Sequence, residues 1–218
     1  MIVLGLTGSI AMGKSRAAAA FQLCGVPVFD ADAVVHLLMV PGGSAVPAIA
    51  AAFPGSLNDA GGVDRAGLGR LVFGDALALR QLEAIIHPRV RAEEGAFLRR
   101  CCRAGVPVAV LDVPLLLETH GEARVDRVVV VSAHATLQAD RALRRPGMTA
   151  VKLAQIRAKQ VPDAVKRRRA DYINPSGQDR GLVVAAVRRI VQDAARLPPG
   201  VWPGRWLHRS GVGLLHAA

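Results

Sequence analysis

A glycine-rich stretch near the start of the chain carries residue types that bind phosphate groups. It reads Gly8-Ser9-Ile10-Ala11-Met12-Gly13-Lys14-Ser15 and fits the pattern G-x-x-x-x-G-K-[ST]. Glycines allow the backbone to curl so that successive N–H groups point at phosphate oxygens. The lysine can reach the β- and γ-phosphates of a nucleoside triphosphate, and the serine hydroxyl can hold Mg²⁺. The stretch therefore predicts a site for a nucleoside triphosphate with Mg²⁺.

The segments on either side of this stretch give it the context of a P-loop. The apolar run Ile2–Thr7 has the character of a buried strand, and residues 13–23 have the character of a helix. A strand, a glycine-rich loop and a helix in register support the motif, whereas a chance glycine-rich loop is the alternative. The nucleotide-binding residues that we expect are Gly8, Ala11, Met12, Gly13, Lys14, Ser15 and Arg16.

Two aspartates that follow apolar runs could serve phosphoryl transfer. Asp32 comes shortly after the run 26–29, where a carboxylate could orient and partly deprotonate an acceptor hydroxyl. An aspartate that caps the next helix is the alternative. Asp112 ends the run 106–111, so it could bind Mg²⁺, often through water, or could cap the following turn. Glu118 is a weaker second candidate for the metal.

Basic residues late in the chain could stabilise the charge on a transferring phosphoryl group. Arg141 and Arg145 are four residues apart and would share one face of a helix expected over 134–145. They could converge on the phosphoryl group as arginine fingers do, whereas Arg144 would face solvent. The run Lys-Arg-Arg-Arg at 166–169 could contact a substrate phosphate or nucleic acid, but a solvated face is the arrangement that we expect.

The net charge is uneven along the 218 residues of the chain. The chain carries 28 Lys+Arg and 17 Asp+Glu, a net charge of +11. Residues 1–137 hold 12 of each kind, whereas residues 138–171 hold ten cations and three acids. A nucleic-acid-binding protein could show this pattern, and so could an enzyme with an arginine-bearing lid over a polyphosphate. An aromatic content of only 4% argues against binding of single strands by base stacking.

Composition and motifs argue against several other classes. No apolar run approaches the roughly 18 residues of a membrane span, and the N-terminus lacks the features of a signal peptide. The three cysteines have no C-x-x-C spacing, which argues against structural zinc or a disulfide framework and favours the reducing cytoplasm. A GTPase is disfavoured because the chain has no N-K-x-D motif to read guanine. The arginine-rich late segment favours a small-molecule kinase instead.

Predicted strands and helices alternate along the chain, which is typical of an α/β fold. We expect a three-layer P-loop NTPase fold, in which a mainly parallel sheet has helices on both faces. The further strands that we expect lie at 26–29, 106–111, 125–131 and near 172–173, and the further helices at 65–86, 88–103, 134–145, 150–160, 162–169 and 179–196.

Six elements occur along the chain in a fixed order. They are the P-loop, Val28-Phe29-Asp30-Ala31-Asp32, Ile86-His87-Pro88, Leu111-Asp112-Val113-Pro114-Leu115-Leu116-Leu117-Glu118, the pattern Gln138-x-x-Arg141-x-x-x-Arg145 followed by Gln160, and Arg169-Ala170-Asp171-Tyr172. With these elements in order and at matching spacing, the chain resembles the dephospho-coenzyme A kinase family from residue 2 to about 195. Each element is weak alone, but together they are specific.

The resemblance implies an activity and assigns residues to it. The family transfers the γ-phosphoryl group of ATP to the ribose 3′-hydroxyl of dephospho-coenzyme A, the last step of coenzyme A synthesis. The resemblance therefore implies ATP, dephospho-coenzyme A and Mg²⁺ as partners. It favours Asp32 over Asp30 at the acceptor hydroxyl, and it moves His87 from a structural or capping role toward the acceptor site.

The resemblance also implies how the chain is organised. We expect one kinase domain over 1–197, with a helical acceptor-binding insertion at about 35–104, a helical lid at about 134–169 and an appended tail at 198–218. The enzyme is expected to be a monomer or small homo-oligomer in the cytoplasm, with no nucleic-acid or membrane partner.

The chain departs from the family pattern at several positions. Ala11 and Met12 replace a glycine and a serine in the P-loop, and Arg16 stands where threonine is frequent. Arg157 comes three residues before Gln160, where many members have an arginine four residues before, so no role is transferred to it. Two alternatives remain open. One is a kinase of other nucleosides or nucleotides, and the other is an ATP-binding protein stimulated by nucleic acid.

Overall fold

The computed structural model describes residues 1–198 and 200–205, with the backbone alone at Arg205. The chain divides into two compact units. The first unit joins Met1–Phe29 to the chain from Leu98 onward, and the second is Asp30–Phe97. In the described part of the chain, no helix combines the length and apolar character needed to cross a membrane.

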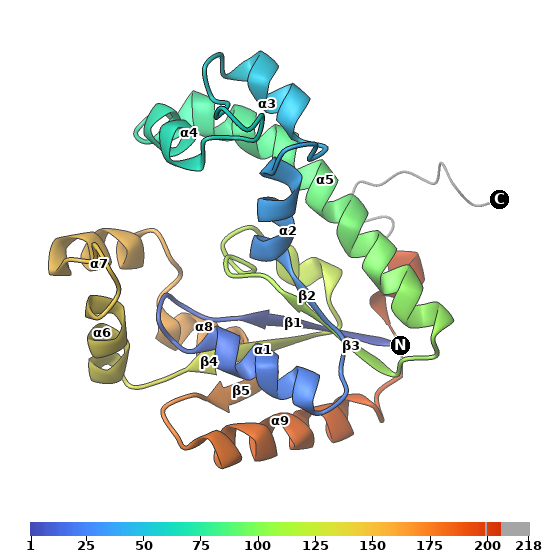
Figure 1. Cartoon of the computed structure of the whole chain (residues 1–218). Helices are drawn as coiled ribbons and strands as arrows, with labels where there is room; N and C mark the ends of the chain where they lie inside the picture. Colours follow the sequence, from blue (N-terminus) through green and yellow to red (C-terminus); the bar gives the residue numbers. More distant parts are fainter. Residues whose placement is uncertain (199, 206–218) are drawn as a thin grey trace. The chain divides into compact units, whose positions relative to one another are not determined.

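A five-stranded sheet forms the centre of the first unit (Figure 1). The strands are β1 (Ile2–Thr7), β2 (Val28–Asp30), β3 (Val108–Asp112), β4 (Arg127–Ser132) and β5 (Tyr172–Pro175), in the order β2-β3-β1-β4-β5. The pairings of β1 with β3, β1 with β4 and β4 with β5 are all parallel. Strands of a parallel sheet are buried on both faces, which explains their continuous apolar runs. The predicted α/β fold with a mainly parallel sheet is confirmed.

The register of the central strands brings functional candidates to one edge of the sheet. Leu6 of β1 pairs with Asp112 of β3, and Thr7 pairs with Val130 of β4. Helix α1 (Lys14–Leu23) begins directly after the glycine-rich loop that follows β1. Because parallel strands end at a common edge, this loop and Asp112 meet where α/β proteins usually bind ligands.

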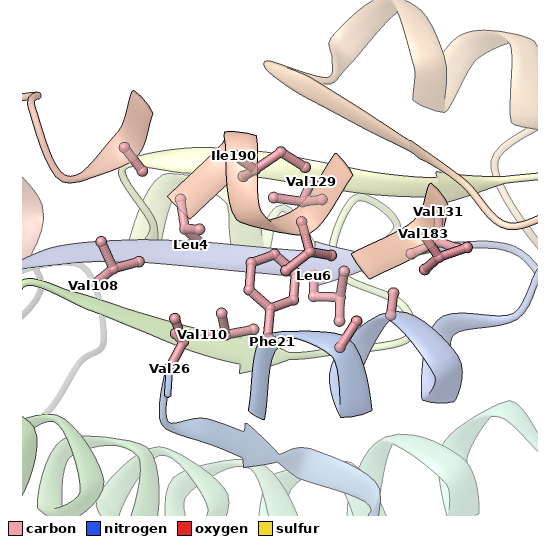
Figure 2. Packing of buried hydrophobic residues seen from close by; sticks show 14 of the residues in the cluster. Leu4, Leu6, Phe21, Val26, Val108, Val110, Val129, Val131, Val183 and Ile190 are labelled. Atoms are coloured by element: carbon pink, nitrogen blue, oxygen red, sulfur yellow. The ribbon is translucent and has the colours of Figure 1, made fainter. Parts of the chain in front are cut away.

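The main apolar core lies between the sheet and two helices, α1 and α9 (Arg180–Ala194). Phe21 of α1 is fully buried in this core, together with alternate side chains of the three central strands (Figure 2). The labelled side chains in Figure 2 are Leu4, Leu6, Phe21, Val26, Val108, Val110, Val129, Val131, Val183 and Ile190. Burying about ten such side chains is the dominant stabilising term for this layer.

The opposite face of the sheet is closed by the connection between β3 and β4 and by α8 (Asp163–Arg169), which packs on β4. Gly5 of β1 shows how closely this face is packed. A Cβ at this position would lie 2.6 Å from Leu116 Cδ2 and 3.1 Å from Val125 Cγ2. The connection also contains a short 3₁₀ turn, η1 (Gly121–Arg124). Helices and packed loops therefore cover both faces of the sheet.

Three helices between β4 and β5 occupy the region expected to form a lid, and we use the word lid only as the name of this segment, residues 135–169. They are α6 (Ala135–Leu143), α7 (Ala150–Ala158) and α8. Thr149 caps α7 by accepting a hydrogen bond from Lys152 N at 3.2 Å, and Pro162 precedes α8. Helix α6 ends at Leu143, two residues earlier than expected, so Arg145 lies in the turn that follows the helix.

The second unit is helical and has a core of its own. It contains α2 (Ala31–Met39), α3 (Val46–Ala52), α4 (Arg65–Val72) and most of α5 (Ala76–Arg103). Apolar side chains from all four helices pack together in it, among them Leu38, Ile49, Leu68 and Ile86. This core is separate from the one beneath the sheet.

The helix boundaries expected around residues 65–103 were wrong. A break occurs at Gly74, which has a φ of 86°. Asp75 then starts α5 by accepting hydrogen bonds from Leu77 N and Ala78 N, and these two bonds lower the pKa of its carboxyl. Pro88, expected to open a new helix, lies inside α5. The helix continues through it even though proline lacks the N–H that would bond to the carbonyl of Ala84.

The residues just beyond α9 pack against the first unit. Val201 and Trp202 are buried in the turn η2 (Val201–Arg205), which contacts β1. The Asp126 carboxylate accepts hydrogen bonds from Val3 N and Val201 N, both at 2.7 Å. Residues 200–204 of the expected tail are thus attached to the sheet, while residues 199 and 206–218 lie outside the described residues.

Candidate active site

The glycine-rich loop is folded as a tight phosphate-binding turn. Met12 N donates to Ser9 O at 3.1 Å, and the φ angles are 59° at Ala11 and 88° at Gly13. Two positive φ angles so close together turn successive backbone N–H groups toward one side, as an anion nest requires. Only glycine fits at position 8, because a Cβ there would lie 2.8 Å from the carbonyl oxygen of Val131.

Ala11 and Met12, the two P-loop residues that depart from the family pattern, are both packed against neighbouring residues. Ala11 is buried and packs with Ala142 and Leu153 of the lid helices. Met12 is also buried, and its Sδ accepts a hydrogen bond from Ala133 N at 3.2 Å. The loop therefore keeps its shape with a non-glycine residue in the left-handed region, a conformation that costs about 1–3 kcal/mol.

Lys14 and Asp112 form an ion pair at the carboxyl edge of the sheet. Lys14 Nζ lies 2.6 Å from Asp112 Oδ1, and the Asp112 side chain is only 4% exposed. The pairing follows from the register, since β3 lies beside β1 and the P-loop leads directly into α1. A lysine held in this way is already in place for the phosphates of a nucleotide.

Two hard oxygen donors lie at the start of α1 and the end of β3. Ser15 is exposed in the first turn of α1, and Asp112 ends β3. Over residues 1–198 and 200–205, no group of three or more His, Cys, Asp or Glu side chains could hold a metal ion. Mg²⁺ is bound in nucleotide sites through one or two protein oxygens together with substrate phosphates and water, so this donor set fits Mg²⁺.

Ser176 joins the P-loop to the lid, although it was not singled out from the sequence. Its hydroxyl donates to Met12 O, and its backbone N donates to Ser132 O at 2.9 Å. Arg141 donates to Ser176 twice, from Nη1 to Oγ at 3.2 Å and from Nη2 to the carbonyl at 2.9 Å. A Cβ at Gly13 would lie 2.8 Å from Ser176 Oγ. The serine therefore lies beside the P-loop and holds Arg141 against it.

The three lid arginines considered from the sequence have different environments. Arg141 is half-buried beside the P-loop, whereas Arg145 is exposed after the end of α6. The expectation that these two residues share one face of a continuous helix was therefore wrong. Arg144 pairs with Asp140 on the surface, with a distance of 3.1 Å between Nη2 and Oδ1. The structure brings Arg141 alone of these three to the P-loop.

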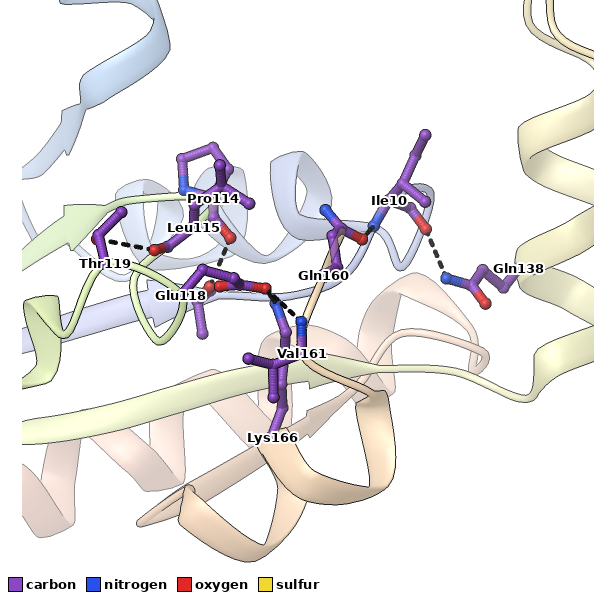
Figure 3. A network of polar contacts seen from close by, with 10 residues as sticks. Ile10, Pro114, Leu115, Glu118, Thr119, Gln138, Gln160, Val161 and Lys166 are labelled. Carbon is purple, nitrogen blue, oxygen red and sulfur yellow. Dashed lines mark hydrogen bonds and ion pairs between the residues drawn. The ribbon is translucent and has the colours of Figure 1, made fainter. Parts of the chain in front are cut away.

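Two lid glutamines bind the same P-loop residue from opposite sides (Figure 3). Gln138 Nε2 donates to Ile10 O at 2.9 Å, and Ile10 N donates to Gln160 Oε1 at 3.0 Å. The next residue, Val161, donates from its backbone N to Glu118 Oε1 at 2.9 Å. These contacts connect the P-loop with α6 and with the segment between α7 and α8.

Glu118 and Lys166 form a buried ion pair beneath this segment, with 2.8 Å between Oε1 and Nζ. Lys166 has no exposed side-chain surface, so the expectation of a solvated face at 166–169 was wrong for this residue. Its neighbours Arg167, Arg168 and Arg169 are exposed, and Arg169 pairs with Glu122. Glu118, a weaker candidate for the metal, is instead engaged with Lys166 and Val161.

A cavity of about 260 Å³ lies where the P-loop meets the lid. Its lining includes Ser9, Gln138, Gln160, Asp163 and Arg157. Arg157, to which no role was transferred, therefore faces the same space as the P-loop. Its spacing from Gln160, one residue shorter than in many members of the family that the chain resembles, is the reason that the sequence assigned it no role.

Arg16, expected to contact the nucleotide, is exposed near the start of α1. It lines a separate hollow of about 230 Å³ between α1 and α9, together with Leu23, Arg180 and Val183.

Asp32 and His87 lie in the second unit. Asp30 caps α2 by accepting a hydrogen bond from Ala33 N at 3.0 Å, so it takes the capping role that was the alternative for Asp32. Asp32 is exposed in the first turn of α2, and His87 is exposed on α5 directly before Pro88. The structure therefore places both side chains at the surface of the helical unit.

Comparison with known proteins identifies the family. A family model described as Dephospho-CoA kinase matches residues 2–178. The dephospho-CoA kinase of Mesorhizobium japonicum is 57% identical over 193 residues, which cover 88% of this chain and 96% of the relative. That of Rhodopseudomonas palustris is 52% identical over 198 residues, covering 91% and 98%.

Solved structures agree with this fold. The crystal structure of TT1252 from Thermus thermophilus aligns with a TM-score of 0.76 at 29% identity, covering 88% of this chain and 97% of the other. A dephospho-CoA kinase from Campylobacter jejuni aligns with a TM-score of 0.60 at 20% identity, covering 88% and 96%, and supports the fold. With its P-loop formed and the family match spanning residues 2–178, the chain belongs to the dephospho-CoA kinase family.

Proposed function

We propose that this protein transfers the γ-phosphoryl group of ATP to the ribose 3′-hydroxyl of dephospho-coenzyme A. The observation that carries this proposal is the Lys14–Asp112 pair at a formed P-loop, in a chain of this family. Phosphoryl transfer depends mainly on positioning and on stabilising charge. The roles of individual residues follow from these two needs.

The P-loop binds the phosphates of ATP. The backbone N–H groups of the loop and the N-terminus of α1 provide positive potential, and Lys14 adds a full charge. When ATP binds, Lys14 exchanges some of its interaction with Asp112 for phosphate oxygens. Because Asp112 is buried beside it, the lysine stays ordered without nucleotide and loses little side-chain entropy on binding.

Ser15 and Asp112 would hold Mg²⁺ at the phosphates, Ser15 by its hydroxyl and Asp112 by its carboxylate, directly or through water. Bound Mg²⁺ neutralises charge on the β- and γ-phosphates and orients them for transfer.

Asp32 is the proposed base at the acceptor. Its exposed carboxylate in the first turn of α2 accepts the proton of the ribose 3′-hydroxyl as that oxygen attacks the γ-phosphorus. The bond from the γ-phosphorus to the bridging oxygen breaks, and ADP leaves. His87 contributes to binding of the acceptor within the helical unit Asp30–Phe97.

Arg141 and Arg145 stabilise the charge that develops on the transferring phosphoryl group. Arg141 is already held beside the P-loop by two hydrogen bonds to Ser176, so the planar guanidinium has a fixed orientation. Arg145 is exposed after α6 and would be recruited when the nucleotide binds.

An assay of ADP release with alternative acceptors tests this function. We expect strong turnover with dephospho-coenzyme A and weak turnover with adenosine or AMP. Strong turnover on adenosine or AMP with none on dephospho-coenzyme A would instead indicate another nucleoside or nucleotide kinase. ATP hydrolysis that rises with added RNA and falls steeply with salt, without a phosphorylated small molecule, would indicate a nucleic-acid-stimulated protein.

A further inference from the structure

The Ile10 peptide groups in the P-loop are held by side chains of the lid rather than by the loop itself. Gln138 from α6 donates to Ile10 O, and Gln160 from the α7–α8 connection accepts from Ile10 N. Gln138 is 2% exposed, so its hydrogen bond to Ile10 O is shielded from water. One residue of the P-loop thus has both of its backbone polar groups bound by two separate parts of the lid (Figure 3).

The contact at Ile10 O controls the orientation of the next backbone amide. A peptide unit is planar and trans, so the Ile10 carbonyl and the Ala11 N–H point in opposite directions. A donor that fixes the carbonyl therefore also fixes the direction of the Ala11 N–H. Ala11 has a φ of 59°, a conformation that a non-glycine residue adopts only when its surroundings impose it. The contact with Gln138 is one such constraint.

The position of Gln160 depends on the buried pair beneath it. Glu118 Oε1 binds both Val161 N, the residue next to Gln160, and the Lys166 ammonium. A buried ion pair is expensive to desolvate and is often no more stabilising than apolar residues of the same volume. Here it joins the connection after β3 to the segment that carries Gln160, which gives the pair a role in placing that segment.

We propose that Gln138 and Gln160 are positioning residues that hold the two peptide units flanking Ile10, Gln160 at the Ser9–Ile10 peptide and Gln138 at the Ile10–Ala11 peptide, so that the Ala11 N–H is set for contact with nucleotide phosphate. The Glu118–Lys166 pair holds Gln160 in place. The inference rests on the proposed ATP site. It deepens that proposal by making the lid part of the ground-state phosphate site, and not only a cover for the reaction.

Calorimetric titration with ATP and ADP, in the absence of acceptor, tests the two glutamines. Gln138→Met and Gln160→Met keep the side-chain length and remove the hydrogen bonds. Each is expected to raise the Kd for ATP and for ADP about five- to tenfold. The matched control is Gln155→Met on α7, whose side chain is exposed and which should bind both nucleotides as the wild type does.

The steady-state constants separate positioning from a general structural defect. We expect KM for ATP to rise in both variants, while kcat at saturating ATP stays within about twofold of the wild type. An unchanged Kd for ATP in both variants would overturn the proposal, whether or not kcat falls. Gln160 is only half-buried, so its variant keeps the test valid if Gln138→Met does not fold.

The double variant tests whether the two glutamines act together through Ile10, which each of them holds at one of its two flanking peptide units. Because both hold Ile10, the loss of affinity in Gln138→Met/Gln160→Met should be smaller than the product of the two single losses. A loss equal to that product would show that they act independently, contrary to the proposal.

A rescue experiment at Glu118 and Lys166 tests whether this buried pair holds Gln160 in place. Lys166→Met leaves Glu118 without its cation. We expect the Glu118 carboxylate to move and to disturb its hydrogen bond with Val161 N, which displaces the neighbouring Gln160 and lowers the affinity for ATP. Glu118→Gln added to Lys166→Met removes the uncompensated charge and keeps an amide oxygen for Val161 N, so affinity should recover. A double variant as weak as the single one would overturn the role of the pair.

Failure of this proposal is distinguishable from failure of the proposed function. Wild-type protein that binds ATP but does not phosphorylate dephospho-coenzyme A would contradict the function and leave the binding comparison intact. Wild-type turnover on dephospho-coenzyme A, with unchanged ATP affinity in the glutamine variants, would contradict only the present inference.

Discussion

The candidate functional side chains of the two units differ in whether other residues of the chain hold them in place. In the first unit, Lys14 pairs with Asp112, and Arg141 is held by two hydrogen bonds to Ser176. In the second unit, Asp32 and His87 are exposed on their helices. Lys14 and Arg141, proposed to act on the nucleotide, are therefore held in place by other residues of their unit, whereas Asp32 and His87 are exposed, and we propose that the acceptor supplies their partners.

This difference has an energetic consequence. A residue that is both functional and well packed serves stability and activity together, so its replacement should reduce both. An exposed functional residue makes little contribution to stability, so its replacement should reduce activity alone. Four substitutions, taken from the largest expected effect to the smallest, test this division.

Asp32→Asn is expected to lower kcat by roughly 10²–10⁴-fold, because an amide cannot take the proton of the acceptor hydroxyl. The free energy of unfolding and the Kd for ATP should stay unchanged, since Asp32 is exposed. Steady-state kinetics with chemical denaturation measures all three. Asp30→Asn is the control, because asparagine caps helices as well as aspartate does, and it should retain both activity and stability. Unchanged kcat in Asp32→Asn would refute its role as the base.

Lys14→Met is expected to lower kcat/KM by about 10²–10³-fold through loss of a charged donor to the phosphates. Unlike Asp32→Asn, it should also reduce the free energy of unfolding, by about 1–3 kcal/mol, because the buried Asp112 carboxylate loses its lysine partner. Urea denaturation of the variant without ligand provides the measurement. A loss of activity with no loss of stability would break the comparison between the units.

Arg141→Lys is expected to reduce kcat by about 10²-fold, because an ammonium cannot make the forked contact with Ser176 that orients the guanidinium. The control is Arg144→Lys on the same helix, whose exposed pair with Asp140 survives the change and contributes less than about 1 kcal/mol. Single-turnover measurements at saturating ATP compare the two variants. Equal rates in both would show that the Ser176 contact has no functional role.

Ala11→Gly is expected to change the free energy of unfolding by less than about 0.5 kcal/mol. Relief of the left-handed conformation is offset by the lost methyl contact with Ala142 and Leu153 and by the greater backbone entropy of glycine when unfolded. Ala17→Gly is the matched control, because Ala17 is buried in α1 and has no strain to relieve. It should cost about 1–2 kcal/mol. Thermal unfolding that ranks the two equally would show that Ala11 is unstrained.

The strands and the P-loop were predictable because both have local signals. Continuous apolar runs predicted the parallel strands to within about two residues at each end, and the spacing of Gly8, Gly13 and Lys14 predicted the loop. The expectation that a new helix starts at Pro88 was wrong because it, too, rested on a local signal alone. Its local signal favours a helix start, but packing of residues on both sides of it, such as Ile86, keeps α5 continuous.

The contacts around the P-loop could not be predicted, because they join residues far apart in the sequence. Lys166 belongs to a run of four cations, and nothing in that run distinguishes the one that is buried against Glu118. Ser176 follows β5 and has no motif that marks it as the partner of Arg141. Part of the excess positive charge of residues 138–171 is therefore neutralised within the chain. Lys166, Arg144 and Arg169 each form an ion pair with an acidic side chain, so they have less charge to offer a polyphosphate than the sequence suggested.

The Asp126 carboxylate, which binds Val3 N and Val201 N, has a consequence for synthesis of the chain. The first strand emerges from the ribosome early, but its neighbours β3 and β4 begin more than 100 residues later, and the Val201 contact later still. Contacts of such long sequence separation form slowly. Until then β1 is an apolar segment with unpaired edges, a state that favours aggregation.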